Sequence, residues 1–183
     1  MSRLLTVNEI QTLKSQGCYA EDWTAINVGE DFSPEHITRV DFYGEVNLGE
    51  FNKNVEVSRG FSKHSGIRNA TLRNCTIGDN CLIENIGGHI NNYIIGDDCI
   101  ITNVGTIETT EGATYGEGNI ISVLNEVGDG NVMLFHGLTS QIAALMVKHE
   151  KDTDFTHAIR SMISNEVAQK VQDCGFVGDR VKI

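Results

Sequence analysis

Six histidines are available for acid–base chemistry in this chain, and His64 is the one whose surroundings suit it best. It lies in the polar segment Lys63-His64-Ser65-Gly66, where we expect an exposed corner between two strands. An unperturbed histidine has a pKa close to neutrality, so its neutral form can accept a proton from a hydroxyl or an amine. Lys63 can meet an anionic substrate. We therefore predict His64 as the catalytic base and Lys63 as a substrate-binding residue.

Further polar candidates lie where the sequence pattern changes. His89 interrupts a series of isoleucines, and it is either a hydrogen-bonded core residue or a corner residue turned outward. Asn92 could line a polar groove, although an asparagine ladder would explain it without a ligand. Asn125 and Glu126 precede a predicted hairpin, where they either enter a cleft or form a turn. We predict substrate-binding roles for His89, Asn92, Asn125 and Glu126, and no metal site.

An internal repeat must position these residues. Residues 73–86 and 91–104 are near copies at a spacing of 18, with identical residues in seven of the fourteen aligned pairs. A period of six within the repeat suits neither an amphipathic helix nor one long strand, so it predicts three short strands joined by tight corners. Stacked at strand-pairing distance, these turns form a parallel β-helix. The period is carried by large apolar residues at Ile77, Ile83, Ile95, Ile101 and Ile107.

The corners and the interior of the repeat have characteristic residues. Gly-Asp pairs follow the inward isoleucines, and these residue types form turns and tolerate a positive φ. Cys81 and Cys99 are small enough to lie inside the coil as thiols, although they would be near enough to bridge if oxidised. Asparagines at the same position of successive repeats should stack and share amide hydrogen bonds. We expect such ladders for Asn74 with Asn92 and for Asn85 with Asn103.

The pattern divides the chain into four parts and predicts a mostly β fold. Residues 1–36 form an N-terminal helical cap, in which Thr6 and Glu9 are spaced as a capping box. Residues 37–123 form the β-helix, in which each coil corresponds to one full repeat of three hexads. Residues 124–176 form a hairpin and a two-helix insertion, because apolar residues there recur at helical spacing. Residues 177–183 return to the β-helix, which we expect to be truncated at that point.

The composition indicates a folded protein and argues against several partners. The chain has 25 acidic and 14 basic residues, which gives a net charge of −11. Sequence-independent nucleic-acid binding needs clustered cations, so we predict no nucleic-acid partner. The amino-terminal residues lack the apolar core of a signal peptide, and no apolar run reaches membrane-spanning length. We therefore predict a cytoplasmic protein without a membrane partner.

The hexads Ile77-Gly78-Asp79-Asn80-Cys81-Leu82 and Ile95-Gly96-Asp97-Asp98-Cys99-Ile100 resemble the hexapeptide repeats of left-handed β-helix transferases. The left-handed direction of the coil is implied by this resemblance. More narrowly, most of the chain resembles an uncharacterised bacterial β-helix family with longer members and a helical insertion at this place. That family resemblance implies the front piece of a longer protein, and it is carried by the segments 33–35, 63–67, 74–80 and 123–126.

The resemblance to hexapeptide acyltransferases implies a mechanism. Such enzymes commonly trimerise, bind acyl-CoA or acyl carrier protein along the groove between solenoids, and use a histidine to deprotonate the acceptor. The resemblance thus implies a homo-oligomer such as a trimer, a small-molecule substrate, and an acyl-CoA or sugar nucleotide as the second substrate. Transfer of an acyl group to a small hydroxyl or amine would use His64 as the base. A backbone N–H or an asparagine amide could stabilise the oxyanion.

A second class of function stays open. The chain could be a noncatalytic β-helix scaffold or oligomerisation domain of a longer protein, because every repeated residue already has a packing role. A zinc hydratase resembling the γ-class carbonic anhydrases is excluded. That family has two zinc-binding histidines five positions apart, and no two histidines of this chain have that spacing.

Overall fold

The computed structural model describes residues 2–122, 130–169 and 173–183 of a mostly β chain that forms two compact units. The first unit contains the residues up to Thr110 together with Cys174–Ile183, and the second contains Glu111–Asp173. Each unit has a hydrophobic core of its own. No helix in the described ranges combines the length and the apolarity needed to cross a lipid bilayer.

The first unit begins with the predicted capping box. After β1 (Ser2–Leu4), α1 (Val7–Ser15) starts at Thr6, whose hydroxyl accepts a hydrogen bond from the backbone N–H of Glu9. The Glu9 carboxylate accepts in return from the backbone N–H of Thr6, so two amides of the helix start are satisfied. A hydrogen-bonded ion pair with Arg3 lowers the pKa of Glu9 to about 2. This pair ties β1 to the start of α1.

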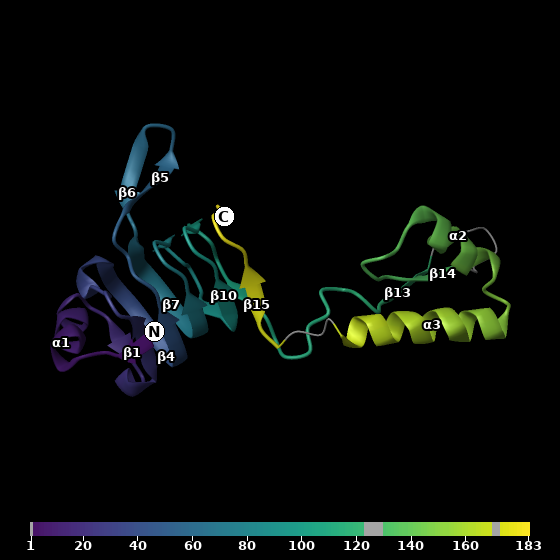
Figure 1. Ribbon diagram of the computed structural model, residues 1–183, viewed down its shortest axis with the longest axis horizontal. Helices are drawn as coiled ribbons and strands as arrows, with labels where there is room; N and C mark the ends of the chain where they lie inside the picture. Colours follow the sequence, from purple (N-terminus) through teal and green to yellow (C-terminus); the bar gives the residue numbers. More distant parts are fainter. Residues whose placement is uncertain (1, 123–129, 170–172) are drawn as a thin grey trace. The chain divides into compact units, whose positions relative to one another are not determined.

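Most strands of the first unit lie side by side (Figure 1) and pair in parallel. Their pairs form three sets, which we name ladders A, B and C. Ladder A joins the starts of β4 (Ile37–Leu48) and β7 (Gly66–Ile77) to β8 (Leu82–Glu84) and β11 (Ile100–Thr102). Ladder B joins β2 (Tyr19–Ala20), the middles of β4 and β7, β9 (Ile90–Asn91) and β12 (Ile107–Glu108). Ladder C joins β3 (Ile26–Gly29), the ends of β4 and β7, β10 (Tyr93–Ile95) and β15 (Gly175–Val177).

Residues that are one sequence repeat apart pair with each other in these ladders. Ile77 pairs with Ile95 in ladder C, and Ile83 pairs with Ile101 in ladder A. All four side chains are at most 1% exposed, and burial of an isoleucine stabilises a fold by roughly 1.5–3 kcal/mol. Cys99 is buried beside them, and its thiol donates to the Gly178 carbonyl at 3.1 Å. The repeated apolar residues therefore form the core.

The Gly-Asp corners connect one repeat to the next by hydrogen bonds. The Asp97 carboxylate accepts from the backbone N–H of Asp79 at 2.8 Å, and the Asp179 carboxylate accepts from that of Asp97 at 3.0 Å. A Cβ atom on Gly78 would collide with the Asp97 carboxylate, so glycine is required for the close approach of the two corners. These aspartates have a structural role.

Residues 54–64 correct the sequence prediction, which placed them in the β-helix. They form an antiparallel hairpin of β5 (Asn54–Ser58) and β6 (Phe61–His64), with its turn at Gly60, where φ is +76°. Val55 is buried against Leu82 and Ile100, whose side chains lie on the face of ladder A opposite to the core. Alternating apolar residues are typical of both a hairpin strand and a repeat strand, so the sequence pattern did not distinguish them.

His89 does not occupy the inward position of the isoleucine series. Ile90 is fully buried there and pairs with Leu72 and Ile107, while the His89 side chain is 39% exposed. The register therefore shifts by one residue after the corner at Gly87 and Gly88, because the apolar neighbour gains more from burial than the imidazole does.

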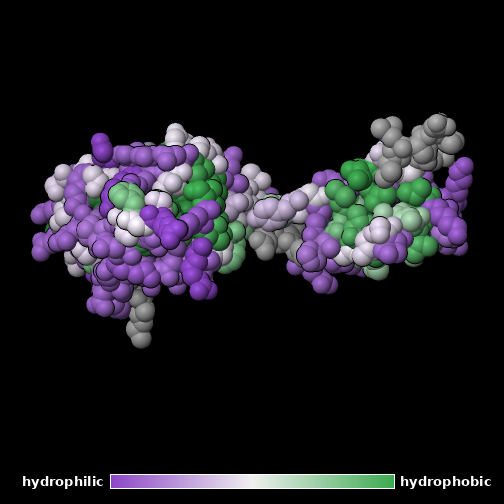
Figure 2. Space-filling view, turned by 90° about the horizontal axis from the view of Figure 1, so that it is seen from above, coloured by the Kyte–Doolittle hydropathy of each residue, from purple (hydrophilic) through white to green (hydrophobic). Residues whose placement is uncertain are grey.

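The second unit combines a strand pair with two helices. β13 (Ile120–Ser122) pairs antiparallel with β14 (Asn131–Met133), and α2 (Ser140–Lys148) and α3 (Thr153–Ala168) follow. Residues 111–122 thus belong to this unit rather than to the repeat, because Ile120–Ser122 pairs with β14. Figure 2 shows apolar side chains gathered on the visible face of this unit. Its buried core consists of Val132, Phe135, Met146, Ile163 and Val167.

The chain returns to the first unit at Cys174. Tyr93 pairs with Gly175 and Ile95 pairs with Val177, so β15 extends ladder C although the whole second unit lies between these strands in the sequence. Lys182 then forms a parallel bridge with Ile100 and extends ladder A. In the sequence, the second unit is therefore inserted between β12 of ladder B and β15 of ladder C, which belong to one repeat.

Candidate functional site

His64 and Lys63 lie at the base of the β5–β6 hairpin, where several other titratable side chains meet them. Arg68 comes from β7 and Glu84 from the neighbouring strand β8 of ladder A. His36 ends the short 3₁₀ helix η2 (Pro34–His36), which has Ser33 as its N-cap. We call these five residues the hairpin-base cluster.

The His36 and His64 imidazoles are stacked, with 3.5 Å between the ring centroids and 22° between the ring planes. The pairing of Ile37 with Ile67 in ladder A sets their approach. Gly66 makes it sterically feasible, because a Cβ atom at this position, where φ is +142°, would collide with the carbonyl oxygen of His36. The stack therefore depends on a residue without a side chain.

Hydrogen bonding indicates which nitrogen of His64 carries the proton. Its Nδ1 lies 2.9 Å from the carbonyl oxygen of Ser65, which can only accept a hydrogen bond. Nδ1 is therefore the donor in the neutral ring, and Nε2 carries the lone pair. The Arg68 guanidinium donates to the His64 carbonyl oxygen at 3.2 and 3.3 Å and fixes the backbone at this point.

Glu84 is the anionic centre of the cluster. The residue is only 8% exposed, and its carboxylate accepts from Lys63 Nζ at 2.5 Å and from Arg68 Nη1 at 3.0 Å. Two cations thus surround one carboxylate, which leaves an excess positive charge at the base of the hairpin. Such a local excess attracts anions even in a chain whose net charge is −11.

Burial lowers the pKa of His36, and the neighbouring His64 and Arg68 lower it further. His36 therefore stays neutral at pH 7, and the stacked rings do not carry two positive charges. Ser65 is fully buried, and its hydroxyl has no hydrogen-bond partner among the residues that the structure describes. Together, the cluster holds the neutral His36 imidazole and the His64 imidazole beside two cations. This arrangement is suited to proton transfer near an anionic ligand.

The structure brings only part of the predicted site together. His64 and Lys63 are in the cluster, whereas His89 lies in ladder B, where its Nε2 is 2.9 Å from the Glu108 carboxylate. Asn92 is at a corner with φ +57°, and its side-chain amide donates to the Thr109 carbonyl oxygen at 3.1 Å. Asn125 and Glu126 lie outside the described residues.

The stacking predicted for Asn85 and Asn103 is confirmed. The side-chain amide of Asn85 donates to that of Asn103 at 3.2 Å. Both residues have a φ of +56° or +57°, a conformation that asparagine tolerates better than most residues. This ladder needs no ligand to explain it.

Sequence reasoning missed His36, Arg68 and Glu84 as members of the cluster. A signal was present, since His36-Ile37 and Gly66-Ile67 occupy equivalent positions of neighbouring repeats. The hairpin inserted between them makes their separation longer than one repeat, so the period of the sequence does not align them. Within the described ranges, no group of three His, Cys, Asp or Glu side chains is arranged to hold a metal ion.

Comparison with known proteins gives a family but no activity. The chain is 28% identical over 175 residues to an uncharacterised protein of Treponema pallidum (strain Nichols), and the match covers 90% of the chain but 24% of that relative. No solved structure matches the chain. The family described as a domain of unknown function, DUF4954, matches residues 2–183. The chain therefore belongs to the DUF4954 family.

Proposed function

We propose that the first unit is a left-handed parallel β-helix of the hexapeptide-repeat, transferase-like type. Three observations support this proposal: the parallel ladders, the register that follows the sequence repeat, and the hydrogen-bonded corners between repeats. In this interpretation ladders A, B and C are the three faces of a triangular coil. The left-handed direction follows from the resemblance of the hexads.

We propose that this β-helix transfers an acyl group from acyl-CoA to a small hydroxyl or amine, with His64 as the general base. The observation that carries the proposal is the His64 imidazole, whose Nδ1 is held by the Ser65 carbonyl oxygen. Nε2 accepts the acceptor's proton while the acceptor oxygen or nitrogen bonds to the thioester carbonyl carbon. The C–S bond then breaks, and the thiolate takes the proton from the imidazolium.

The neighbours of His64 support this role. The imidazolium formed during the reaction lies beside a neutral His36, because the lowered pKa of His36 keeps a second positive charge away. Lys63 and Arg68 share the single carboxylate of Glu84, so their excess charge can meet an anionic acceptor. Lys63 thereby retains its predicted role in substrate binding.

A groove on the same ladder offers cations for the phosphates of an acyl-CoA. Its volume is about 280 Å³, and its lining includes the basic residues Lys53, Arg180 and Lys182 and the acidic residues Glu56 and Asp98. Lys53 is paired with Asp98 at 2.6 Å, and Lys182 donates to the Glu56 carbonyl oxygen at 2.8 Å. Arg180 and Lys182 are therefore the cations that would meet the phosphates of an anionic donor.

Release of free CoA thiol from acetyl-CoA, measured with a panel of amine and hydroxyl acceptors including sugar nucleotides, tests the proposal. We expect His64→Ala to reduce turnover by at least about 100-fold, the lower range of general-base contributions. His157→Ala is the matched control, since His157 is exposed on α3. Turnover that survives His64→Ala, or no turnover with any acceptor, would refute the assignment of His64.

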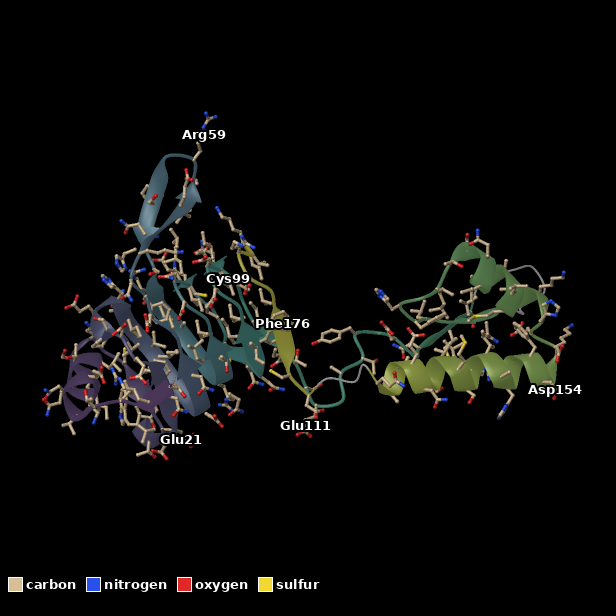
Figure 3. All side chains as sticks on the ribbon, in the orientation of Figure 1. Glu21, Arg59, Cys99, Glu111, Asp154 and Phe176 are labelled. Atoms are coloured by element: carbon tan, nitrogen blue, oxygen red, sulfur yellow. The ribbon has the colours of Figure 1, made fainter. Side chains whose placement is uncertain are left out.

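A noncatalytic scaffold or oligomerisation domain is the second candidate, and exposed apolar residues of ladder C favour it. Ile94 is 43% exposed and Phe176, which projects from β15, is 63% exposed (Figure 3). Sedimentation velocity decides whether this face joins copies of the chain. A trimer that Phe176→Ser dissociates would support this candidate, and a monomer at every concentration would count against it.

A further inference from the structure

The outer face of ladder B contains a polar groove that the proposed acyl transfer does not use. Its volume is about 400 Å³, and the strand register explains its composition. Tyr43 pairs with Arg73, Arg73 with Asn91, and Asn91 with Glu108, so four outward side chains form a row across neighbouring strands. The groove is lined by Thr71, Arg73, Gly88, His89, Asn91 and Glu108.

Two contacts hold the charged side chains of the groove in place. His89 Nε2 lies 2.9 Å from a carboxylate oxygen of Glu108. The Arg73 guanidinium lies over the Tyr43 ring, 5.1 Å from its centroid. Arg73 and Glu108 thus present a donor and an acceptor from two sides of one groove, and the Asn91 amide and the Thr71 hydroxyl can each donate and accept.

An aromatic surface continues this face. The Tyr19 ring lies 6.0 Å from that of Tyr43 and is tilted by 55°, and Tyr19 is 53% exposed. An exposed aromatic ring can contact the C–H groups of a ligand, and the polar side chains of the groove can satisfy its hydroxyl groups. The face therefore combines hydrogen-bonding side chains with an exposed apolar ring.

The lining excludes other classes of ligand. An apolar molecule would bury Thr71, Asn91 and Glu108 without hydrogen-bond partners, which is unfavourable. A polyanion needs several cations, but Arg73 is the only Lys or Arg among the described lining residues, and Glu108 is negatively charged. A neutral ligand with many hydroxyl groups can both accept hydrogen bonds from these side chains and donate hydrogen bonds to them.

We propose that this groove is a binding site for a neutral saccharide. Arg73 and Asn91 donate to hydroxyl or ring oxygens, and the Glu108 carboxylate, oriented by His89, accepts from a hydroxyl pair. Tyr19 contacts the C–H face of a neighbouring sugar ring. The site lies on ladder B and the hairpin-base cluster on ladder A, so the two proposals are independent.

Isothermal titration calorimetry of the chain containing both units with a panel of neutral oligosaccharides tests this proposal. The panel contains gluco-, manno-, galacto- and N-acetylglucosamine oligomers. We expect at least one of them to bind with a Kd near or below about 1 mM. Arg73→Gln and Glu108→Gln should each weaken that binding by at least tenfold. Arg73→Gln removes the guanidinium donors, and Glu108→Gln replaces an acceptor oxygen by an amide donor, so a hydroxyl group of the ligand loses its partner in each case.

Matched variants separate a lost contact from a general charge effect. Arg59→Gln removes an exposed guanidinium at the tip of the hairpin (Figure 3), and Glu45→Gln removes an exposed carboxylate beside ladder C. Both should bind the oligosaccharide like the unmodified chain, and so should His64→Ala. The proposal is overturned if no oligosaccharide of the panel binds, or if Arg73→Gln and Glu108→Gln bind as the controls do.

Discussion

The rings of His36 and His64 lie face to face, 3.5 Å apart between centroids, although all of β4 and β5 lies between them in the sequence. The β5–β6 hairpin, which lies between β4 and β7 in the sequence, brings His64 to this position, and the absence of a Cβ at Gly66 leaves room for His36. Two imidazoles at this distance cannot both be protonated without strong repulsion. The protonation of His36 in this pair can be measured.

The first prediction concerns the pKa of His36. Burial is the main cause of its lowered pKa, and the positive charge of Arg68 adds to it. Arg68→Gln should raise the pKa of His36 part of the way toward 6.5. NMR titration of the His36 ring protons measures the change, and Arg59→Gln serves as a control in which this pKa should not move. A pKa that stays the same after Arg68→Gln would contradict the assigned cause.

The second prediction concerns stability against pH. Because the pKa of His36 is lower in the folded chain than its ordinary 6.5, the unfolded chain binds more protons between the two values. The contribution of His36 is complete above pH 6.5 and is lost as the pH falls through the folded pKa. Thermal melts from pH 8 to pH 5 should therefore show a smaller loss of Tm for His36→Gln than for the unmodified chain. An equal loss would contradict this account.

The third prediction concerns Glu84. Glu84→Gln removes the largely buried carboxylate that Lys63 and Arg68 share, so we expect a loss of about 2–3 kcal/mol in the free energy of unfolding. The exposed Glu21, which is labelled in Figure 3, provides the control, and Glu21→Gln should change this free energy by less than about 0.5 kcal/mol. Urea denaturation measures both. Equal stability of the two variants would show that Glu84 is not the centre of the cluster.

The fourth prediction concerns the corners between repeats. Gly78→Ala places a Cβ against the Asp97 carboxylate and should cost about 1–3 kcal/mol through overpacking. Gly105→Ala is the matched control, because a Cβ there meets no atom within 4 Å. Chemical denaturation compares the two variants. The role assigned to the Gly-Asp corners fails if both alanines are tolerated alike.

The fifth prediction concerns thiol reactivity. Burial raises the pKa of Cys81 to about 12, and Cys99 is likewise fully buried. Neither should react with iodoacetamide at pH 8 in the folded chain, because the thiolate is the reactive form. Cys174 is only partly buried and should react first. Mass spectrometry of peptides after timed labelling tests the order, and early modification of Cys81 would be incompatible with its position in the core.

The repeat allowed much of this fold to be predicted, since identical residues at a fixed spacing must occupy equivalent places. Ile77 and Ile95, which are equivalent in the repeat, pair in ladder C. The prediction of a capping box at Thr6 and Glu9 was also correct, because it depends only on residues that are close in the sequence. Contacts across an insertion could not be predicted in this way. His36 meets His64 only because the hairpin changes the offset between two repeats, and no local pattern contains that information.

The position of Val55 was missed for a related reason. Alternation places its side chain on one face of a strand but does not say which strand is its neighbour. Burial against Leu82 and Ile100 required the hairpin to fold back upon ladder A. His89 and Ile90 are adjacent, so a shift of one residue at a glycine corner was enough to exchange inside and outside.

Both insertions leave the parallel register intact when the chain resumes. Ladder C continues from Tyr93 to Gly175 as though the second unit were absent, and ladder A accepts Ile67 beside Ile37 in spite of the hairpin. The repeat therefore accepts insertions of different length at these two points, because the parallel strand pairs form again after each insertion. Segments can be gained or exchanged at these points in evolution or by engineering, while the stacked isoleucines remain paired.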